Sequence, residues 1–348
     1  MRHKIRNTHI VIVHVGCFMN DNRIVLKGTN KRDAGCFLLF VFLLPYVCAC
    51  LWGHVGEETE ALRQGKEQVD AREGTDGRII QAVMSWGIWE IPMEEYLVYQ
   101  LAAVMPKTYE AEALKAQAVL LRTEVIQVIQ EQGITVLQVA GDGLEKWYEA
   151  DAQALEALRP FRQAVEDTAG LYLCYDGKAI QASYFKISNG QTRDAGEVWN
   201  TERCPYLTSV VCEQDKAAAD YYSEVAISQS DYLYEIQKHI EEECSPQELW
   251  EGLRLTYDGA GYVTNVSFYA EDKEVGQIEG EAFRYLFSLA SASFEAENIG
   301  TQMIFRVEGV GHGFGMSQYG ANCRAINGET YDQILKDFFV GTELAKIE

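Results

Sequence analysis

The most constraining stretch of this sequence lies near its C-terminus, where glycine occupies every odd position from 309 to 315. Val310, His312, Phe314 and Met316 alternate with these glycines. Successive side chains of a strand point to opposite faces, so a strand here would carry all of its bare backbone on one face. Because each glycine weakens a strand, the run predicts that another backbone or a ligand approaches that face closely.

Charge is distributed unevenly along the chain. Residues 1–50 carry seven Lys and Arg against two acidic residues, whereas the whole chain has a formal net charge of −22. The part beyond residue 50 is therefore strongly acidic. Binding to phosphate groups needs a basic surface, so the composition argues against nucleic acid as a partner.

An uncharged apolar run of 18 residues, 36–53, follows Lys27, Lys31 and Arg32. This length is at the lower limit for spanning a bilayer, and the preceding basic residues predict that the N-terminal end is cytoplasmic. We therefore expect a basic cytoplasmic leader (1–35), a single membrane-spanning segment (36–53), a charged linker (54–77) and a domain outside the membrane (78–348). A cleaved signal peptide and a lipoprotein anchor through Cys50 are open alternatives that also export the domain.

The sequence offers few ligands for a metal. Beyond residue 54 the only histidines are His239 and His312, and the only cysteines are Cys174, Cys204, Cys212, Cys244 and Cys323. The nearest cysteine pair, 204 and 212, matches no zinc signature. We expect no metal site and no cofactor, and the odd number of thiols allows one or two disulfides with a thiol left over.

The first half of the domain is predicted to be mainly helical. Residues 78–90 favour a strand. Apolar residues at helical spacing predict one helix from Pro92 to Pro106 and a second from Tyr109 to about Gln132, capped by Thr108. A third helix is expected over 145–167, with a break at Pro160.

The second half is predicted to alternate hairpins and helices. Asp176-Gly177 and Asp258-Gly259 indicate tight turns, the first followed by a strand over 179–187. Residues 213–250 resemble a charged helical insertion, a helix is expected near 281–289 and a strand over 303–316. Thr330 and Gln333 form a capping box before a last helix. Helices and antiparallel hairpins without βαβ regularity favour the α+β class.

Several separated motifs carry a family resemblance. They are Pro92–Leu97, Glu112–Val119 with Arg122-Thr123, Thr168–Gly170, Ala182–Phe185, Ser188-Asn189-Gly190, the glycine stretch through Ala321, and Gly341–Leu344. Together, and in this order, they resemble the stage II sporulation protein D (SpoIID/LytB) family over roughly residues 78–348. The resemblance implies a single domain of that family behind the N-terminal anchor.

The resemblance also implies a function in the cell wall. Members similar to the sporulation protein cleave the glycan strands of peptidoglycan as lytic transglycosylases during engulfment of the forespore. Relatives similar to LytB are described instead as enhancers of a cell-wall amidase. The expected partners are thus peptidoglycan glycan strands, with a cell-wall amidase or other sporulation membrane proteins as further candidates.

The chain departs from the family at the position that carries the chemistry. The family's catalytic Glu lies in an Ala-Glu-Met-Pro-like motif, which here reads Ala103-Val104-Met105-Pro106. Valine cannot protonate a glycosidic oxygen. Either this activity is lost and binding or partner activation is kept, or a nearby acid replaces it. Glu95 and Glu110 are the candidate substitutes, although acids in a first helical turn also simply favour the helix dipole.

The motifs supply the candidate glycan-binding residues, with His312 at the centre of the predicted glycine strand. Each of them has a structural alternative: a buried imidazole for His312, an N-cap for Ser317 or a plain turn at Ser188-Asn189-Gly190. A nucleophilic pair of Ser317 with His312 lacks any nucleophile-elbow motif. The candidate residues are Gln117, Arg122, Ser188, Asn189, His312, Gly313, Ser317 and Gln318.

Overall fold

A computed structural model describes residues 12–13, 77–199, 202–240 and 244–347 of the chain. The predicted leader, apolar run and linker lie almost wholly outside these residues. Within the described ranges, no helix is long and apolar enough to cross a membrane. The anchor at residues 36–53 therefore stays a prediction.

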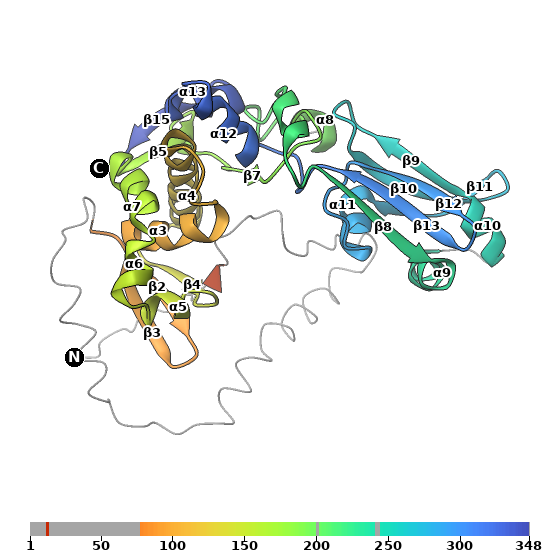
Figure 1. Cartoon of the computed structure of the whole chain (residues 1–348), viewed down its shortest axis with the longest axis horizontal. Coiled ribbons are helices and arrows are strands. Elements are labelled where there is room, and N and C mark those ends of the chain that lie inside the picture. Colours follow the sequence, from red (N-terminus) through yellow and green to blue (C-terminus); the bar gives the residue numbers. More distant parts are fainter. Residues whose placement is uncertain (1–11, 14–76, 200–201, 241–243, 348) are drawn as a thin grey trace, which may run out of the picture. The chain divides into compact units, whose positions relative to one another are not determined.

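The helix α4 (Ala111–Gln132) is the centre of the first hydrophobic core. Its side chains are buried on nearly every side from Ala113 to Val128, as expected of a helix enclosed by others. It ends at Gly133, whose φ of 62° gives the left-handed conformation that stops helices. Figure 1 shows the helices packed against α4, which are α3 (Met93–Val104), α7 (Arg159–Asp167), α12 (Gln318–Ile326) and α13 (Tyr331–Phe338).

Three small sheets belong to this part of the chain. The first has the order β1-β4-β2-β3, the second β15-β5-β6, and the third is the pair β14-β7. Their strands are β1 (Ile12–Val13), β2 (Ile79–Met84), β3 (Gly87–Pro92), β4 (Leu137–Ala140), β5 (Leu171–Tyr175), β6 (Lys178–Ala179), β7 (Tyr184–Phe185), β14 (Met316–Ser317) and β15 (Glu343–Lys346). Short helices connect them: α5 (Glu145–Tyr148), α6 (Ala152–Glu156), α8 (Ala195–Trp199) and the 3₁₀ turn η1 (Glu213–Ala217).

A second hydrophobic core is built between residues 222 and 308. Phe283 lies at its centre, in contact with the rings of Phe287, Phe294 and Phe305. Two three-stranded antiparallel sheets enclose it: β12-β13-β8 and β11-β10-β9. The strands are β8 (Tyr222–Ser228), β9 (Leu253–Tyr257), β10 (Val263–Ala270), β11 (Lys273–Glu279), β12 (Phe294–Ile299) and β13 (Gln302–Glu308), and the helices are α9 (Gln229–Ile236), η2 (Gln237–His239), α10 (Pro246–Glu251) and α11 (Gly280–Leu286).

The structure confirms the α+β class and several of the predicted elements. The two helices around Pro106, the turns at Asp176-Gly177 and Asp258-Gly259, and the capping box of Thr330 with Gln333 are all present. The sheets are not purely antiparallel, however. The pairs β1–β4, β2–β4 and β7–β14 are parallel.

Two predicted elements in the first half are wrong in extent. Residues 78–90 do not form one strand, because the chain turns at Ser85-Trp86 and folds β2 onto β3. The predicted helix over 145–167 is divided into α5, α6 and α7. One division lies at Asp151, whose side chain accepts a hydrogen bond from the Ala154 N–H and begins a new helix. The other division confirms the predicted break: α6 ends at Glu156, and Pro160 lies in the first turn of α7, which begins at Arg159.

Other errors come from tertiary contacts that the local pattern does not contain. Thr108 is not the cap of α4, because Tyr109 closes a turn onto Pro106 and Glu110 becomes the N-cap. The predicted strand over 179–187 is interrupted where the Gln181 N–H bonds the Tyr206 hydroxyl. The charged segment 213–250 contains α9 and α10 but also β8, which pairs with β13. The strand β15 was not predicted; it pairs with β5, more than 160 residues earlier.

Candidate functional site

The glycine stretch is not a strand. Strand β13 ends at Glu308, and Gly309, Gly311, Gly313 and Gly315 then adopt φ angles of 74°, 117°, 84° and 76°. A side chain at Gly315 would put its Cβ 2.0 Å from the Ser183 carbonyl oxygen. The bare backbone therefore faces the protein's own segment 183–193, and close packing, not a ligand on an open strand face, explains the four glycines.

His312 is buried within this packing. Its Nδ1 accepts a hydrogen bond from the Phe314 N–H at 3.1 Å, so Nε2 carries the proton and donates to the Tyr184 carbonyl at 3.1 Å. Burial lowers the pKa of His312 to about 3, and the ring is neutral at physiological pH. The imidazole has the geometry of the structural alternative, because both of its ring nitrogens bond backbone groups.

Ser317 and Ser188 meet at a third residue, Asp215, which the sequence analysis did not single out. The Ser317 hydroxyl donates to Asp215 Oδ2 at 2.5 Å, and the Ser188 N–H donates to the same oxygen at 2.7 Å. All three residues are fully buried. Burial raises the pKa of the Asp215 carboxyl, while the two serines oppose that shift.

The Asp215 contacts join three segments that are distant in sequence. Ser317 is also the N-cap of α12, because its hydroxyl accepts a bond from the Gly320 N–H at 3.2 Å. Ser188 begins the predicted turn, and its hydroxyl accepts a bond from the Gly190 N–H. Since Asp215 has no exposed surface, this carboxyl holds the start of α12 against the turn and does not face solvent.

Gln117 and Gln318 also come together, although 201 positions separate them. The Gln318 side-chain amide donates to Gln117 Oε1 at 3.1 Å, and both side chains are buried. Close by in sequence, the Glu110 N–H donates to the Asn322 side chain at 2.8 Å. These bonds fix α12 against α4.

Arg122 is fully buried and holds three elements together. Its guanidinium forms a two-pronged ion pair with Glu94, with distances of 2.8 and 2.6 Å, and donates to the carbonyls of Val165 and Leu171. This fork joins α4 to the first turn of α3, to α7 and to β5. The sequence made Arg122 a candidate for glycan contact, but in the structure its bonds are all to other parts of the protein.

Asn189 reaches from the first core to the second. Its side-chain amide donates to the Ala260 carbonyl at 2.8 Å and to the Ser293 hydroxyl at 3.0 Å. Its backbone N–H donates to the hydroxyl of Tyr262. The turn at Ser188-Asn189-Gly190 is therefore a connection between the two cores.

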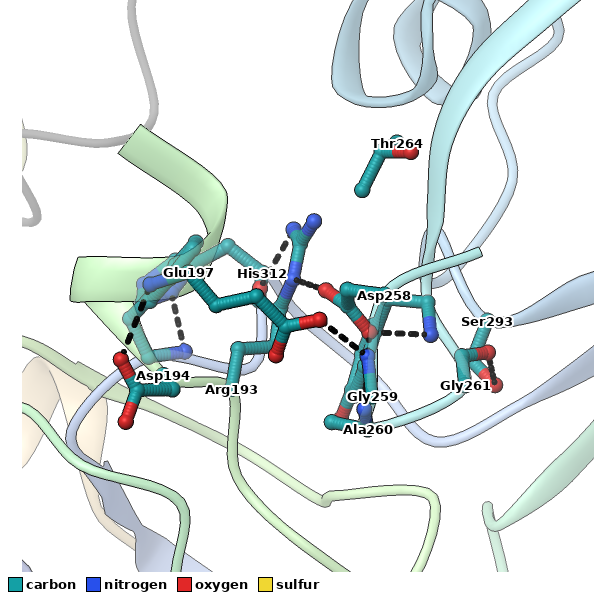
Figure 2. A network of polar contacts seen from close by, with 12 residues as sticks. Arg193, Asp194, Glu197, Asp258, Gly259, Ala260, Gly261, Thr264, Ser293 and His312 are labelled. Atoms are coloured by element: carbon teal, nitrogen blue, oxygen red, sulfur yellow. Dashed lines mark hydrogen bonds and ion pairs between the residues drawn. The ribbon is translucent and has the colours of Figure 1, made fainter. Parts of the chain in front are cut away.

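Arg193 makes a buried ion pair between the two parts of the protein that hold these cores (Figure 2). Its Nε lies 2.6 Å from an Asp258 carboxylate oxygen, and both side chains are almost fully buried. The guanidinium carbon lies 4.7 Å from the Phe314 ring centroid and 5.1 Å from that of Tyr262. A second contact in the same view joins the Glu197 carboxylate to the Gly259 N–H at 2.8 Å.

The two candidate carboxylates are placed differently from each other. Glu95 lies in the first turn of α3 and forms a two-pronged ion pair with Arg162. Glu110 is exposed at the N-cap of α4. Val104 is the last residue of α3 and packs, partly buried, against the first core. Nine residues of helix put Glu95 about 13 Å from Val104 along the axis.

The cysteines and Trp199 also have structural roles. The five cysteines of the described ranges are free thiols, so the disulfides that the sequence allowed are not formed there. Trp199 stacks on Phe314 with ring centroids 4.4 Å apart. Its role in the described structure is packing against the first core.

Comparison with known proteins adds independent evidence. Residues 85–175 match the family SpoIID, described as Stage II sporulation protein. The chain is 29% identical over 277 residues to Stage II sporulation protein D of Bacillus subtilis (strain 168), covering 74% of this chain and 76% of that protein. The chain is thus similar to the SpoIID family. The corresponding protein of Bacillus amyloliquefaciens is 29% identical over 270 residues, covering 74% of this chain and 75% of that protein.

A third relative has a different name. The Amidase enhancer of Bacillus subtilis (strain 168) is 25% identical over 291 residues, which is 69% of this chain and 39% of that protein. The similarity to all three relatives extends well beyond the 91 residues of the family match. It therefore includes parts of the chain after residue 175.

The similarity to this family agrees with the motifs, while in the structure several motif residues hold distant parts of the protein together. Ser188, Asn189, Arg122, Gln117, Ser317 and Gln318 bond other parts of the protein, and Gly313 lies where a Cβ would meet Arg193 and Tyr262. Asp215 was missed because a single acid in a charged segment gives no sign of burial.

Proposed function

We propose that this protein is exported, faces the cell wall of a sporulating cell and binds the glycan strands of peptidoglycan without cleaving them. The family resemblance supports the cell-wall role, and the names of the two Stage II sporulation protein D relatives support its place in sporulation. The observation that carries the second half of the proposal is Val104. General acid–base catalysis contributes roughly 10²–10⁴ in rate, and an isopropyl side chain contributes none of it.

The positions of the nearby acids support this proposal. Glu95 lies at the opposite end of α3 from Val104 and forms an ion pair with Arg162. To act in place of a glutamate at position 104, Glu95 would have to break this ion pair and move its carboxylate along the whole helix. Buried Asp215 is bonded by two serines and has no exposed surface on which to meet a sugar. The fold itself accommodates valine, because Val104 packs on the first core.

The test compares the full chain with Val104→Glu on purified sacculi. We expect the wild type to co-sediment with sacculi and to release no 1,6-anhydro muropeptides. Val104→Glu restores a carboxylate at the family position and is expected to release them. A wild type that stays in the supernatant would refute glycan binding, and anhydro products from the wild type would refute the loss of cleavage.

A retained enzyme activity is the second candidate, and the exposure of Glu110 favours it over other substitutes. Glu110→Gln separates the two functions, because the substitution keeps the N-cap backbone bond to Asn322. Anhydro products that appear with wild type and disappear with Glu110→Gln would establish Glu110 as the acid. Faster digestion of sacculi by a cell-wall amidase in the presence of the wild type would instead support the amidase-enhancer function.

A further inference from the structure

Five aromatic rings form a continuous cluster on the first sheet and its neighbouring helices, and its inner ring, Tyr99, contacts the motif residue Glu95. The ring centroids of Trp86 and Tyr148 are 4.6 Å apart, and those of Tyr148 and Trp89 are 5.2 Å apart. The ring centroids of Trp89 and Tyr99 are 5.9 Å apart, and Tyr99 stacks on Trp147 with centroids 5.8 Å apart. The contacts join the β2–β3 turn, β3, α3 and α5.

The cluster is buried at one end and open at the other. Tyr99 is only 6% exposed, whereas Trp86 is 47% exposed and Tyr148 is 39% exposed. Trp86 lies in the two-residue turn between β2 and β3, a position that small polar residues usually occupy. The inner rings support the outer ones, so the two exposed rings are held in place before any ligand arrives.

The charges around the open end restrict what binds there. Residues 142–149 contain Asp142, Glu145 and Glu149, while the basic Lys146 lies over the Trp147 ring, 4.7 Å from its centroid. An acidic border repels anionic lipid and anionic polymers. The ligands that still fit the open end are neutral molecules that have an apolar face and keep their polar groups in water.

We propose that Trp86 and Tyr148 form a platform that binds neutral N-acetylhexosamine units of a β-1,4-linked glycan. The C–H face of a pyranose ring contacts the aromatic face, while its hydroxyl and acetamido groups stay solvated. This inference rests on the proposed function and adds to it a ligand class and a location outside the family motifs.

The test uses the full chain and a tetramer of β-1,4-linked N-acetylglucosamine, with binding measured by calorimetry. Trp86→Ala and Tyr148→Ala are each expected to weaken binding by tenfold or more, and Trp86→Phe by less because it keeps a ring. Tyr234→Ala is the matched control: Tyr234 is 66% exposed on α9, a helix of the second core region, and its loss is expected to leave the affinity unchanged. If Tyr148→Ala does not fold, the affinity of Trp86→Ala for the tetramer is sufficient to test the proposal, because Trp86 lies in an exposed turn.

Sedimentation with sacculi separates failure of the platform from failure of the proposed function. Equal sedimentation of wild type and Trp86→Ala, with unchanged affinity for the tetramer, overturns the platform and leaves glycan binding in place. A wild type that binds neither sacculi nor tetramer overturns both. Binding to phosphatidylglycerol vesicles that Trp86→Ala abolishes would assign the rings to a membrane and overturn the glycan platform.

Discussion

The two hydrophobic cores differ in how far apart along the chain their contacting residues lie. In the first core, Gln117 bonds Gln318, the Tyr331 N–H bonds Glu112, and β15 pairs with β5. In the second core, β9, β10 and β11 pair with their neighbours in sequence, as do β12 and β13, and even its most distant pairing, β8 with β13, stays within residues 222–308.

The family motifs lie where contacts join residues that are distant in sequence. The candidate residues taken from them lie in the segments that close the first core or connect it to the second. A polar residue in such a motif can therefore hydrogen-bond a distant segment of the chain just as well as it can contact substrate. Three substitutions test this distinction, from the largest expected effect to the smallest.

Arg193→Met is expected to destabilise the connection between the cores most. The substitution leaves Asp258 buried without its counter-charge, at a cost of about 3–5 kcal/mol in the free energy of unfolding. Urea unfolding followed by tryptophan fluorescence measures it. Adding Asp258→Asn removes the stranded charge and should recover part of the loss, since Asp258 Oδ1 also accepts the Tyr262 N–H. A fully stable single variant would show that the ion pair does not hold the cores together.

Gly315→Ala tests whether the glycine stretch serves close packing within the first core. The new Cβ would lie 2.0 Å from the Ser183 carbonyl oxygen at a φ of 76°, and the two effects together should cost about 2–4 kcal/mol. Gly328→Ala is the control, because Gly328 also has a positive φ but a Cβ added there would have no atom within 4 Å. It should cost only about 1–2 kcal/mol. Equal losses in urea unfolding would mean that packing against segment 183–193 is unimportant.

Ser317→Ala compares a helix cap in the first core with one in the second. Loss of the cap and of the bond to Asp215 should cost about 2 kcal/mol, whereas Ser245→Ala, at the more exposed capping box of α10, should cost about 1 kcal/mol. The Ser317 hydroxyl favours ionised Asp215, so its removal raises the pKa of a carboxyl already raised by burial.

This linkage gives the Ser317→Ala comparison a pH dependence. A carboxyl with a raised folded-state pKa binds its proton more tightly in the folded protein, so its contribution to stability is lost as the pH rises. The cost of Ser317→Ala should therefore be larger at about pH 7 than at about pH 4. Ser245 does not bond Asp215, so the loss of stability in Ser245→Ala should not share this pH dependence. The difference in free energy of unfolding between the two variants should therefore become smaller in acid.

Local signals predicted the helices and turns well. Pro106 separates α3 from α4, Asp258-Gly259 turns β9 into β10, and Thr330 with Gln333 caps α13. Each of these features is decided within a few residues by backbone geometry or a cap, so the sequence contains the information directly.

The elements that were missed depend on distant partners. Alternation of glycine at 309–315 is compatible with a strand, and only the approach of segment 183–193 requires four positive φ angles. Strand β15 has no strong pattern of its own and exists because β5 offers an edge. Asp215 was hidden for the same reason, since its two serine partners lie 27 and 102 positions away. The aromatic platform was missed because its rings come from four separate elements.

The pairing of β15 with β5 has a consequence for the order in which a growing chain becomes structured. Strand β5 ends at residue 175, but its partner is made of residues 343–346, so the emerging chain must wait for those residues to complete that sheet. The second core requires nothing beyond residue 308 and is complete earlier. A protein made from its N-terminus would thus finish its inserted part before the part that surrounds it, and a truncation of the last ten residues would harm the first core more than the second.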